Sequence, residues 1–200
     1  MGIERAAEAV RIADTAVRLA PDLAEAHRLL AMGHHISLRL DDAIAEYKKV
    51  VQLRPDFPQA YNNLGVALKR KGELAQAAEN FNKALERQPD FGAALSNRGW
   101  VFAEQNKWSD ARRDFEQALK INPEDDGALY GLSQSLREAR DYAGAQEVLG
   151  QLISRSPNFV YWLEWGRIGL VRYWWVLLAF ALAFFFKGRF TKARLQAHGG

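Results

Sequence analysis

The chain contains no cysteine among its 200 residues, which excludes disulfides, zinc–thiolate sites, thiol nucleophiles and iron–sulfur ligation. It also lacks a Gly-rich phosphate loop, a nucleophile elbow and a metal-ligand helix motif. His34 and His35 are the nearest approach to a metal-binding pair, but neighbouring side chains on a helix point about 100° apart. We therefore expect no enzymatic activity, no metal, no cofactor and no small-molecule substrate.

Excess positive charge is absent from most of the chain. Residues 1–160 carry 21 Lys and Arg against 23 Asp and Glu, whereas residues 161–200 carry six against one. A body without a concentrated positive field is a poor binder of phosphate backbones, so nucleic acid is not an expected partner. The basic tail adjoins an apolar run, and this combination favours anionic lipid headgroups.

Proline is scarce but regularly spaced. Five of the six prolines lie 34 residues apart, and only Pro58 falls outside the series of Pro21, Pro55, Pro89, Pro123 and Pro157. Proline removes a backbone N–H and clashes with the preceding turn, so each one marks the end of a helix. Within each interval, apolar residues recur at steps of three and four in two blocks, which predicts two amphipathic helices per 34-residue unit.

The pattern inside the unit is large-x-x-Leu-Gly, then Ala-x-x-x-aromatic-x-x-Ala, then Pro. The clearest copy, residues 58–91, has Tyr61, Leu64, Gly65, Leu68, Gly72, Ala77, Phe81, Ala84 and Pro89 at these positions. This pattern resembles that of the tetratricopeptide-repeat (TPR) family over residues 24–159. The resemblance implies an all-α, right-handed TPR superhelix of four full repeats, with an N-terminal half repeat before them and a hydrophobic C-terminal helix after them.

TPR proteins bind peptides or partner proteins on the concave face, which the first helix of each repeat lines. Carried over by position, the resemblance implies a partner-binding surface of Arg28, Asn62, Asn63, Lys69, Asn97, Trp100, Tyr130, Gln134 and Arg137. Asn63 and Asn97 stand at equivalent places and resemble two rungs of the asparagine ladder that holds a peptide backbone in some TPR proteins. The alternative for this pair is local helix contacts. Trp100 is either an anchor for a partner side chain or packs against the neighbouring first helix.

Residues 173–186 form an uncharged run of 14 residues that is apolar on every face. A helix of this length spans about 21 Å, short of the roughly 30 Å hydrocarbon core, and adding Ile168–Val171 lengthens it while enclosing Arg172. A spanning helix is our prediction; a cap on the last repeat, a re-entrant element and docking into a membrane partner are the alternatives. The expected membrane-interface residues are Trp162, Trp165, Arg172, Trp174, Trp175, Lys187 and Arg189.

These patterns predict three segments: a TPR solenoid at 1–159, a hydrophobic and transmembrane helix at 160–190 and a short basic tail at 191–200. The expected function is a single-pass, membrane-tethered scaffold or adaptor that binds a protein or peptide partner, with lipid as its second contact. We expect a tail-anchored arrangement with the solenoid in the cytoplasm, because the N-terminus has no apolar stretch of the secretory type. The alternatives are a structural or assembly subunit of an integral membrane complex, or a fragment of a larger membrane enzyme.

Overall fold

The computed structural model describes residues 2–176 and residue 178. These residues form helices and turns and contain no strand. They belong to two compact units, whose boundary falls between Ser135 and Leu136.

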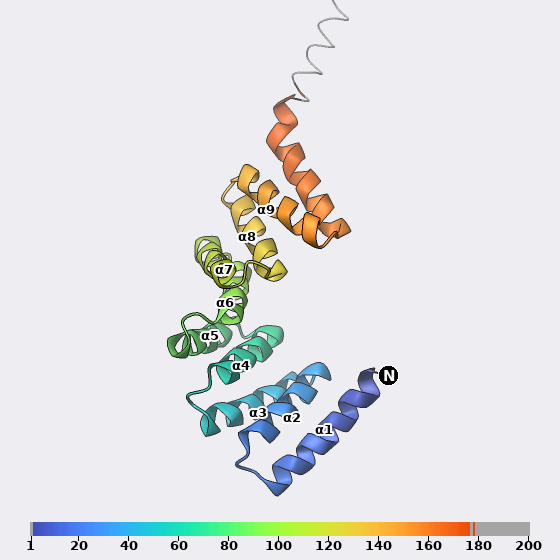
Figure 1. Cartoon of the computed structure of the whole chain (residues 1–200), viewed down its shortest axis with the longest axis vertical. Coiled ribbons are helices and arrows are strands. Elements are labelled where there is room, and N and C mark those ends of the chain that lie inside the picture. Colours follow the sequence, from blue (N-terminus) through green and yellow to red (C-terminus); the bar gives the residue numbers. More distant parts are fainter. Residues whose placement is uncertain (1, 177, 179–200) are drawn as a thin grey trace, which may run out of the picture. The chain divides into compact units, whose positions relative to one another are not determined.

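The helices have similar lengths and are joined by short turns (Figure 1). Their bounds are α1 Gly2–Leu19, α2 Ala24–Ile36, α3 Leu40–Leu53, α4 Pro58–Lys71, α5 Leu74–Arg87, α6 Gly92–Glu104, α7 Trp108–Ile121, α8 Asp126–Glu138 and α9 Tyr142–Arg155. Residues 159–176 are also helical. In the first unit each helix from α1 to α6 packs against the next one, and α4 also contacts α6.

The periodic prolines set the ends of alternate helices. Helices α1, α3, α5, α7 and α9 each end two residues before one of them, so the repeat predicted from the proline spacing is confirmed. Pro58, the one outside the series, is the first residue of α4. The first helical position tolerates proline because its N–H would lack an intrahelical acceptor in any case.

The turns inside the helix pairs share one backbone conformation. Positive φ angles occur at Leu38 (60°), Gly72 (88°), Asn106 (59°) and Arg140 (62°), again 34 residues apart. In each case the residue after the positive-φ position donates its backbone N–H to a carbonyl near the end of the preceding helix, as in the bond of 2.9 Å from Glu73 N to Leu68 O. This is the Schellman arrangement of helix ends. The glycine at 72 is therefore explained, while the other three positions hold side chains in a left-handed conformation.

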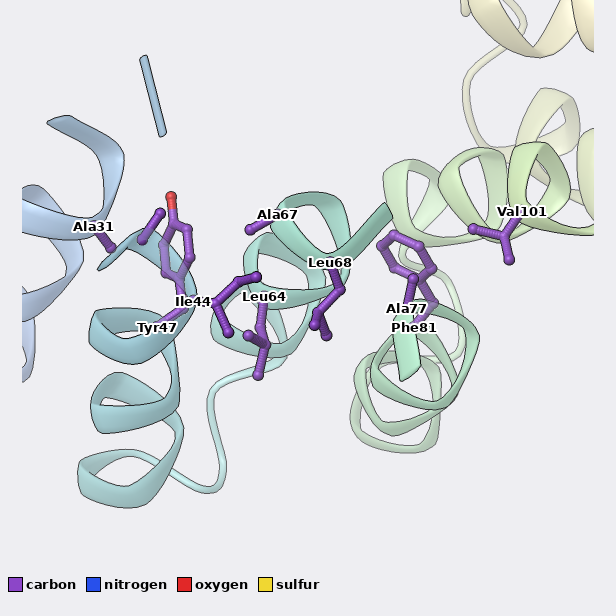
Figure 2. Close-up of a cluster of buried hydrophobic side chains, with 10 residues drawn as sticks. Ala31, Ile44, Tyr47, Leu64, Ala67, Leu68, Ala77, Phe81 and Val101 are labelled. Atoms are coloured by element: carbon purple, nitrogen blue, oxygen red, sulfur yellow. The ribbon is translucent and has the colours of Figure 1, made fainter. Parts of the chain in front are cut away.

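The core consists of small and aromatic residues from both helices of each pair. Figure 2 shows one cluster, in which Phe81 and Ala77 of α5 lie near Leu64 and Leu68 of α4. Phe81 is completely buried, and so is Phe115 of α7. A Cβ built on Gly99 or on Gly131 would lie within 3 Å of the Phe115 ring, so glycine at these two places lets the ring fit between α6 and the start of α8.

In the second unit the helical residues 159–176 pack through one face. Ile168 is buried there, and the side chain of Arg137 donates to Glu164 at 3.0 Å. Gln146 of α9 donates to the Trp165 carbonyl and accepts from Arg172, both at 3.2 Å. Glu164, Ile168 and Arg172 are four residues apart, as expected for one face of a helix.

Candidate partner-binding surface

The predicted site residues of the first unit lie on the first helices of successive pairs. Arg28 belongs to α2, Asn62, Asn63 and Lys69 belong to α4, and Asn97 and Trp100 belong to α6. We call the exposed and half-buried side chains of α2, α4 and α6 the first-helix surface. Tyr130 and Gln134 lie in the part of α8 that belongs to the first unit, and Arg137 lies in the part that belongs to the second.

Three asparagines connect α4 to α6. The Asn97 side-chain amide donates to Asn62 Oδ1 at 3.0 Å, and the Asn62 amide donates to Asn63 Oδ1 at 3.4 Å. Asn62 is buried, so its two hydrogen bonds offset the cost of removing its amide from water. Among the described residues, the Asn63 amide nitrogen and the Asn97 oxygen have no further hydrogen-bond partner. One donor and one acceptor thus remain at half-buried positions.

Trp100 is half-buried between two helices. Its ring meets Phe115 of α7 edge-on, with centroids 5.3 Å apart, and lies 6.1 Å from the Tyr130 ring. Lys69 Nζ lies 5.8 Å from the centroid of the Trp100 ring and 3.3 Å from a Glu104 carboxylate oxygen. Aromatic packing thus fixes the orientation of the indole, and the Lys69 ammonium, paired with Glu104, lies over part of its ring.

A cavity of about 350 Å³ opens on the first-helix surface between α2, α3 and α4. It is lined by Arg28, Met32, His35, Ile36, Tyr47, Asn63 and Val66. Arg28 is oriented by Glu25, to which its Nε donates at 2.8 Å. Burial lowers the pKa of His35, and the neighbouring Arg70 lowers it further, so the neutral imidazole is favoured. Burial also raises the pKa of Tyr47.

Two residues that line this cavity could not be predicted as binding residues from their positions in the repeat. Tyr47 comes from the second helix α3, and at its position an aromatic indicates core packing. Ile36 is highly exposed at the end of α2 although it is apolar. The exposure of this large apolar side chain at the edge of a cavity is what indicates that Ile36 belongs to the binding surface.

A partly buried ion pair connects α6 to the second helix α7. Arg98 Nε and Nη2 both donate to the Asp114 carboxylate at 2.7 Å, and Arg98 Nη1 donates to Asn82 Oδ1 at 2.8 Å. The Asp114 side chain is only 4% exposed. Bidentate geometry of this kind holds a guanidinium firmly, and it fixes the helix that carries Asn97 and Trp100.

The predicted membrane-interface residues lie at the other end of the chain. Trp162, Trp165, Arg172, Trp174 and Trp175 are on the helical residues 159–176, and all five are exposed. Lys187, Arg189, the basic tail at 191–200 and most of the apolar run at 173–186 lie outside the described residues. Within the described part of the chain, no helix combines the length and the apolar character that crossing a bilayer requires.

Comparisons with known proteins agree with the repeat architecture. The TPR repeat family matches residues 39–72, and the Tetratricopeptide repeat family matches residues 63–126 and again residues 102–163. These matches cover residues 39–163 without a gap, and the chain belongs to the tetratricopeptide-repeat family. No curated protein matches the sequence.

Several solved structures share the fold at low sequence identity. MamA is 19% identical with a TM-score of 0.67, and the match covers 72% of this chain and 85% of MamA. YrrB, described as a TPR protein with an unusual peptide-binding site, is 17% identical with a TM-score of 0.67 and coverages of 83% and 86%. A thermophilic TPR protein from Thermus thermophilus is 20% identical with a TM-score of 0.66 and coverages of 84% and 93%.

Proposed function

We propose that this chain is a scaffold that binds an extended peptide segment of a partner protein on the first-helix surface. The observation that carries the proposal is the cavity between α2, α3 and α4, which adjoins Asn63 and continues into the asparagine network of α4 and α6. The cavity offers an apolar space for a side chain. The amide donor of Asn63 and the amide acceptor of Asn97 would pair with the peptide backbone.

The fold-level neighbours agree with this class of function. YrrB is described as having a peptide-binding site, and another neighbour is the assembly of Cut9 with Hcn1. In our proposal Trp100 and Lys69 extend the binding surface beyond the cavity, toward Tyr130 and Gln134 of α8. An indole held by neighbouring rings loses little conformational entropy on binding, which suits it to contact a partner side chain.

A library of random-sequence peptides, screened against the full chain, tests the binding surface. For the tightest peptide, Asn63→Ala with Asn97→Ala should weaken binding roughly tenfold, because two hydrogen bonds of modest net strength are lost. A matched control is Asn80→Ala with Gln117→Ala, which removes two amides from the second helices α5 and α7. Equal affinities of the two double variants, measured by fluorescence anisotropy, would refute the assignment of the binding surface.

A blocking variant tests the cavity separately. Val66→Trp replaces a small aliphatic side chain of the cavity wall with a bulky indole and should abolish binding of the same peptide, while circular dichroism shows the helix content unchanged. Retained binding by a folded Val66→Trp protein would exclude the cavity from the site.

We further propose that the C-terminal segment tethers the scaffold to a membrane, with the repeats on the cytoplasmic side and the tail as the anchor. The support is the uncharged run at 173–186 in the sequence and the exposed tryptophans on residues 159–176. The full chain should sediment with membranes and be released by detergent but not by high salt. Recovery of the full chain in the soluble fraction without detergent would rule out the tether.

A further inference from the structure

The helical residues 159–176 expose a large apolar surface beside the face that packs on α9. Trp162 is 54% exposed, Leu163 is 55% exposed and Leu170 is 63% exposed. These three residues line a cavity of about 690 Å³ together with Glu164, Gly166 and Arg167. Contiguous exposed apolar surface of this kind marks an interaction site, and tryptophan is enriched where proteins meet the boundary between lipid and water.

A second cavity, of about 330 Å³, lies beside the first and is bordered by cations. Arg137 of α8, Arg140 of the following turn and Arg167 converge on it from three segments, with Tyr142 and Glu138 completing its polar lining. Arg137 is bound to Glu164 and Glu138, each at 3.0 Å, and Arg167 reaches Glu164 at 3.7 Å. Arg140 forms no ion pair within the described residues. Three guanidiniums are thus balanced by two carboxylates.

Arg167 connects the two cavities, because its side chain lines both of them. It is 74% exposed, and its one ion pair within the described residues is the long contact to Glu164, so it can turn toward a ligand at little cost. A ligand that fits this arrangement carries a negative charge joined to an apolar chain. Of the partners with that chemistry, an anionic phospholipid also matches the tryptophans nearby and the basic sequence beyond residue 186.

We propose that these two cavities form a binding site for one anionic phospholipid, an inference that rests on the membrane tether proposed above. Arg140 and Arg167 bind the phosphodiester, and Tyr142 donates its hydroxyl to a phosphate oxygen. The acyl chain lies against Trp162, Leu163 and Leu170. The site would hold the second unit at a lipid surface and fix its rotation about the tether.

Lipid titration of the full chain in zwitterionic detergent micelles tests the site. Micelles containing phosphatidylglycerol should be bound more tightly than micelles containing phosphatidylcholine, and added salt should reduce the difference. Removing a guanidinium from an anionic lipid surface weakens binding about fivefold, so Arg140→Ala with Arg167→Ala should weaken binding of phosphatidylglycerol roughly 25-fold. Lysine at both positions retains the charge that an anionic lipid attracts and should restore most of the preference for phosphatidylglycerol.

The matched control is Arg18→Ala with Arg113→Ala. These arginines are 71% and 68% exposed on α1 and α7, so the control removes the same net charge elsewhere. The proposal would be overturned if the control variant lost as much affinity for phosphatidylglycerol as the site variant. Equal binding of the two lipids by the wild-type chain would overturn it as well. If the double variant does not fold, each single alanine variant provides the test instead, and each should weaken binding of phosphatidylglycerol about fivefold.

Two further results distinguish this inference from the proposals on which it rests. A chain that sediments with membranes but has no preference for phosphatidylglycerol would refute the lipid site and leave the tether standing. A dimer that persists in detergent, and that Leu163→Glu with Leu170→Glu dissociates, would assign the apolar cavity to a second copy of the chain and overturn the lipid site.

Discussion

The turn at Gly72 allows the left-handed backbone conformation to be tested almost in isolation. Its φ is 88°, and a Cβ built on it would meet no atom within 4 Å. Gly72→Ala therefore adds backbone strain without adding a steric contact. Leu38 is the opposite case at the equivalent turn, since it has a φ of 60° and a side chain that is 67% exposed. Leu38→Gly removes strain and gives up little buried surface.

The magnitude follows from two opposing terms. A left-handed conformation costs a residue with a side chain about 1–2 kcal/mol relative to glycine. Glycine in turn makes the unfolded chain more flexible, which favours unfolding by about 0.4–1 kcal/mol. Gly72→Ala should therefore lower the free energy of unfolding by about 1 kcal/mol, and Leu38→Gly should raise it by about the same amount.

Thermal and urea unfolding of the full chain, followed by circular dichroism at 222 nm, measures both changes. For a protein of this length, about 1 kcal/mol corresponds to a change in Tm of roughly 2–4 °C, downward for Gly72→Ala and upward for Leu38→Gly. Gly150→Ala is a suitable control, because this glycine is inside helix α9 with open space at its Cβ and should gain stability instead. If Gly72→Ala were neutral or stabilising, the strain argument would be wrong for this turn.

Three other perturbations follow from the same structure. Phe115→Ala should lower the free energy of unfolding by about 3–5 kcal/mol in urea, because the ring is fully buried, and Phe115→Leu should cost much less. Asp114→Ala should cost about 3 kcal/mol by leaving Arg98 without its carboxylate. Asp110 is the control, because its side chain is 41% exposed, and a cost of Asp114→Ala no larger than that of Asp110→Ala would contradict the importance of the pair. Burial lowers the pKa of His35, so the unfolded chain takes up a proton that the folded chain resists, and stability falls as the pH drops below about 6.5. His35→Gln should accordingly reduce the loss of Tm between about pH 7.5 and about pH 5.5, and an unchanged loss would exclude this histidine as its source.

The sequence determined the repeat length and the helix ends. Proline acts through covalent geometry and the loss of one N–H, both of which are local, so Pro55 or Pro89 ends a helix whatever the tertiary contacts. Glycine suits the left-handed turn at residue 72 because it has no Cβ, which is again a local property of the residue. The equivalent turns at Leu38, Asn106 and Arg140 were not predicted, because their residue types do not require a positive φ. There the left-handed conformation accompanies the same helix-end hydrogen bond as at Gly72, and it is one that Leu and Arg disfavour and Asn tolerates.

The partner-binding surface was predictable only as a set of positions. The repeat placed Asn63, Asn97 and Trp100 on first helices, since a helix presents the same face in every copy. The hydrogen bond from Asn97 to the buried Asn62, the packing of Trp100 on Phe115 and the cavity beside Tyr47 depend on side chains from different helices. None of these contacts is encoded in the spacing within one repeat.

The sequence by itself thus determined where this chain turns and which faces of its helices are apolar, because steric limits and periodicity act over a few residues. Only the tertiary structure decided which amide atoms of Asn63 and Asn97 are left without a partner among the described residues, which rings pack together and where three arginines converge on one cavity. Those outcomes depend on how helices distant in sequence approach each other, and that approach is set by the volumes of the side chains packed between them.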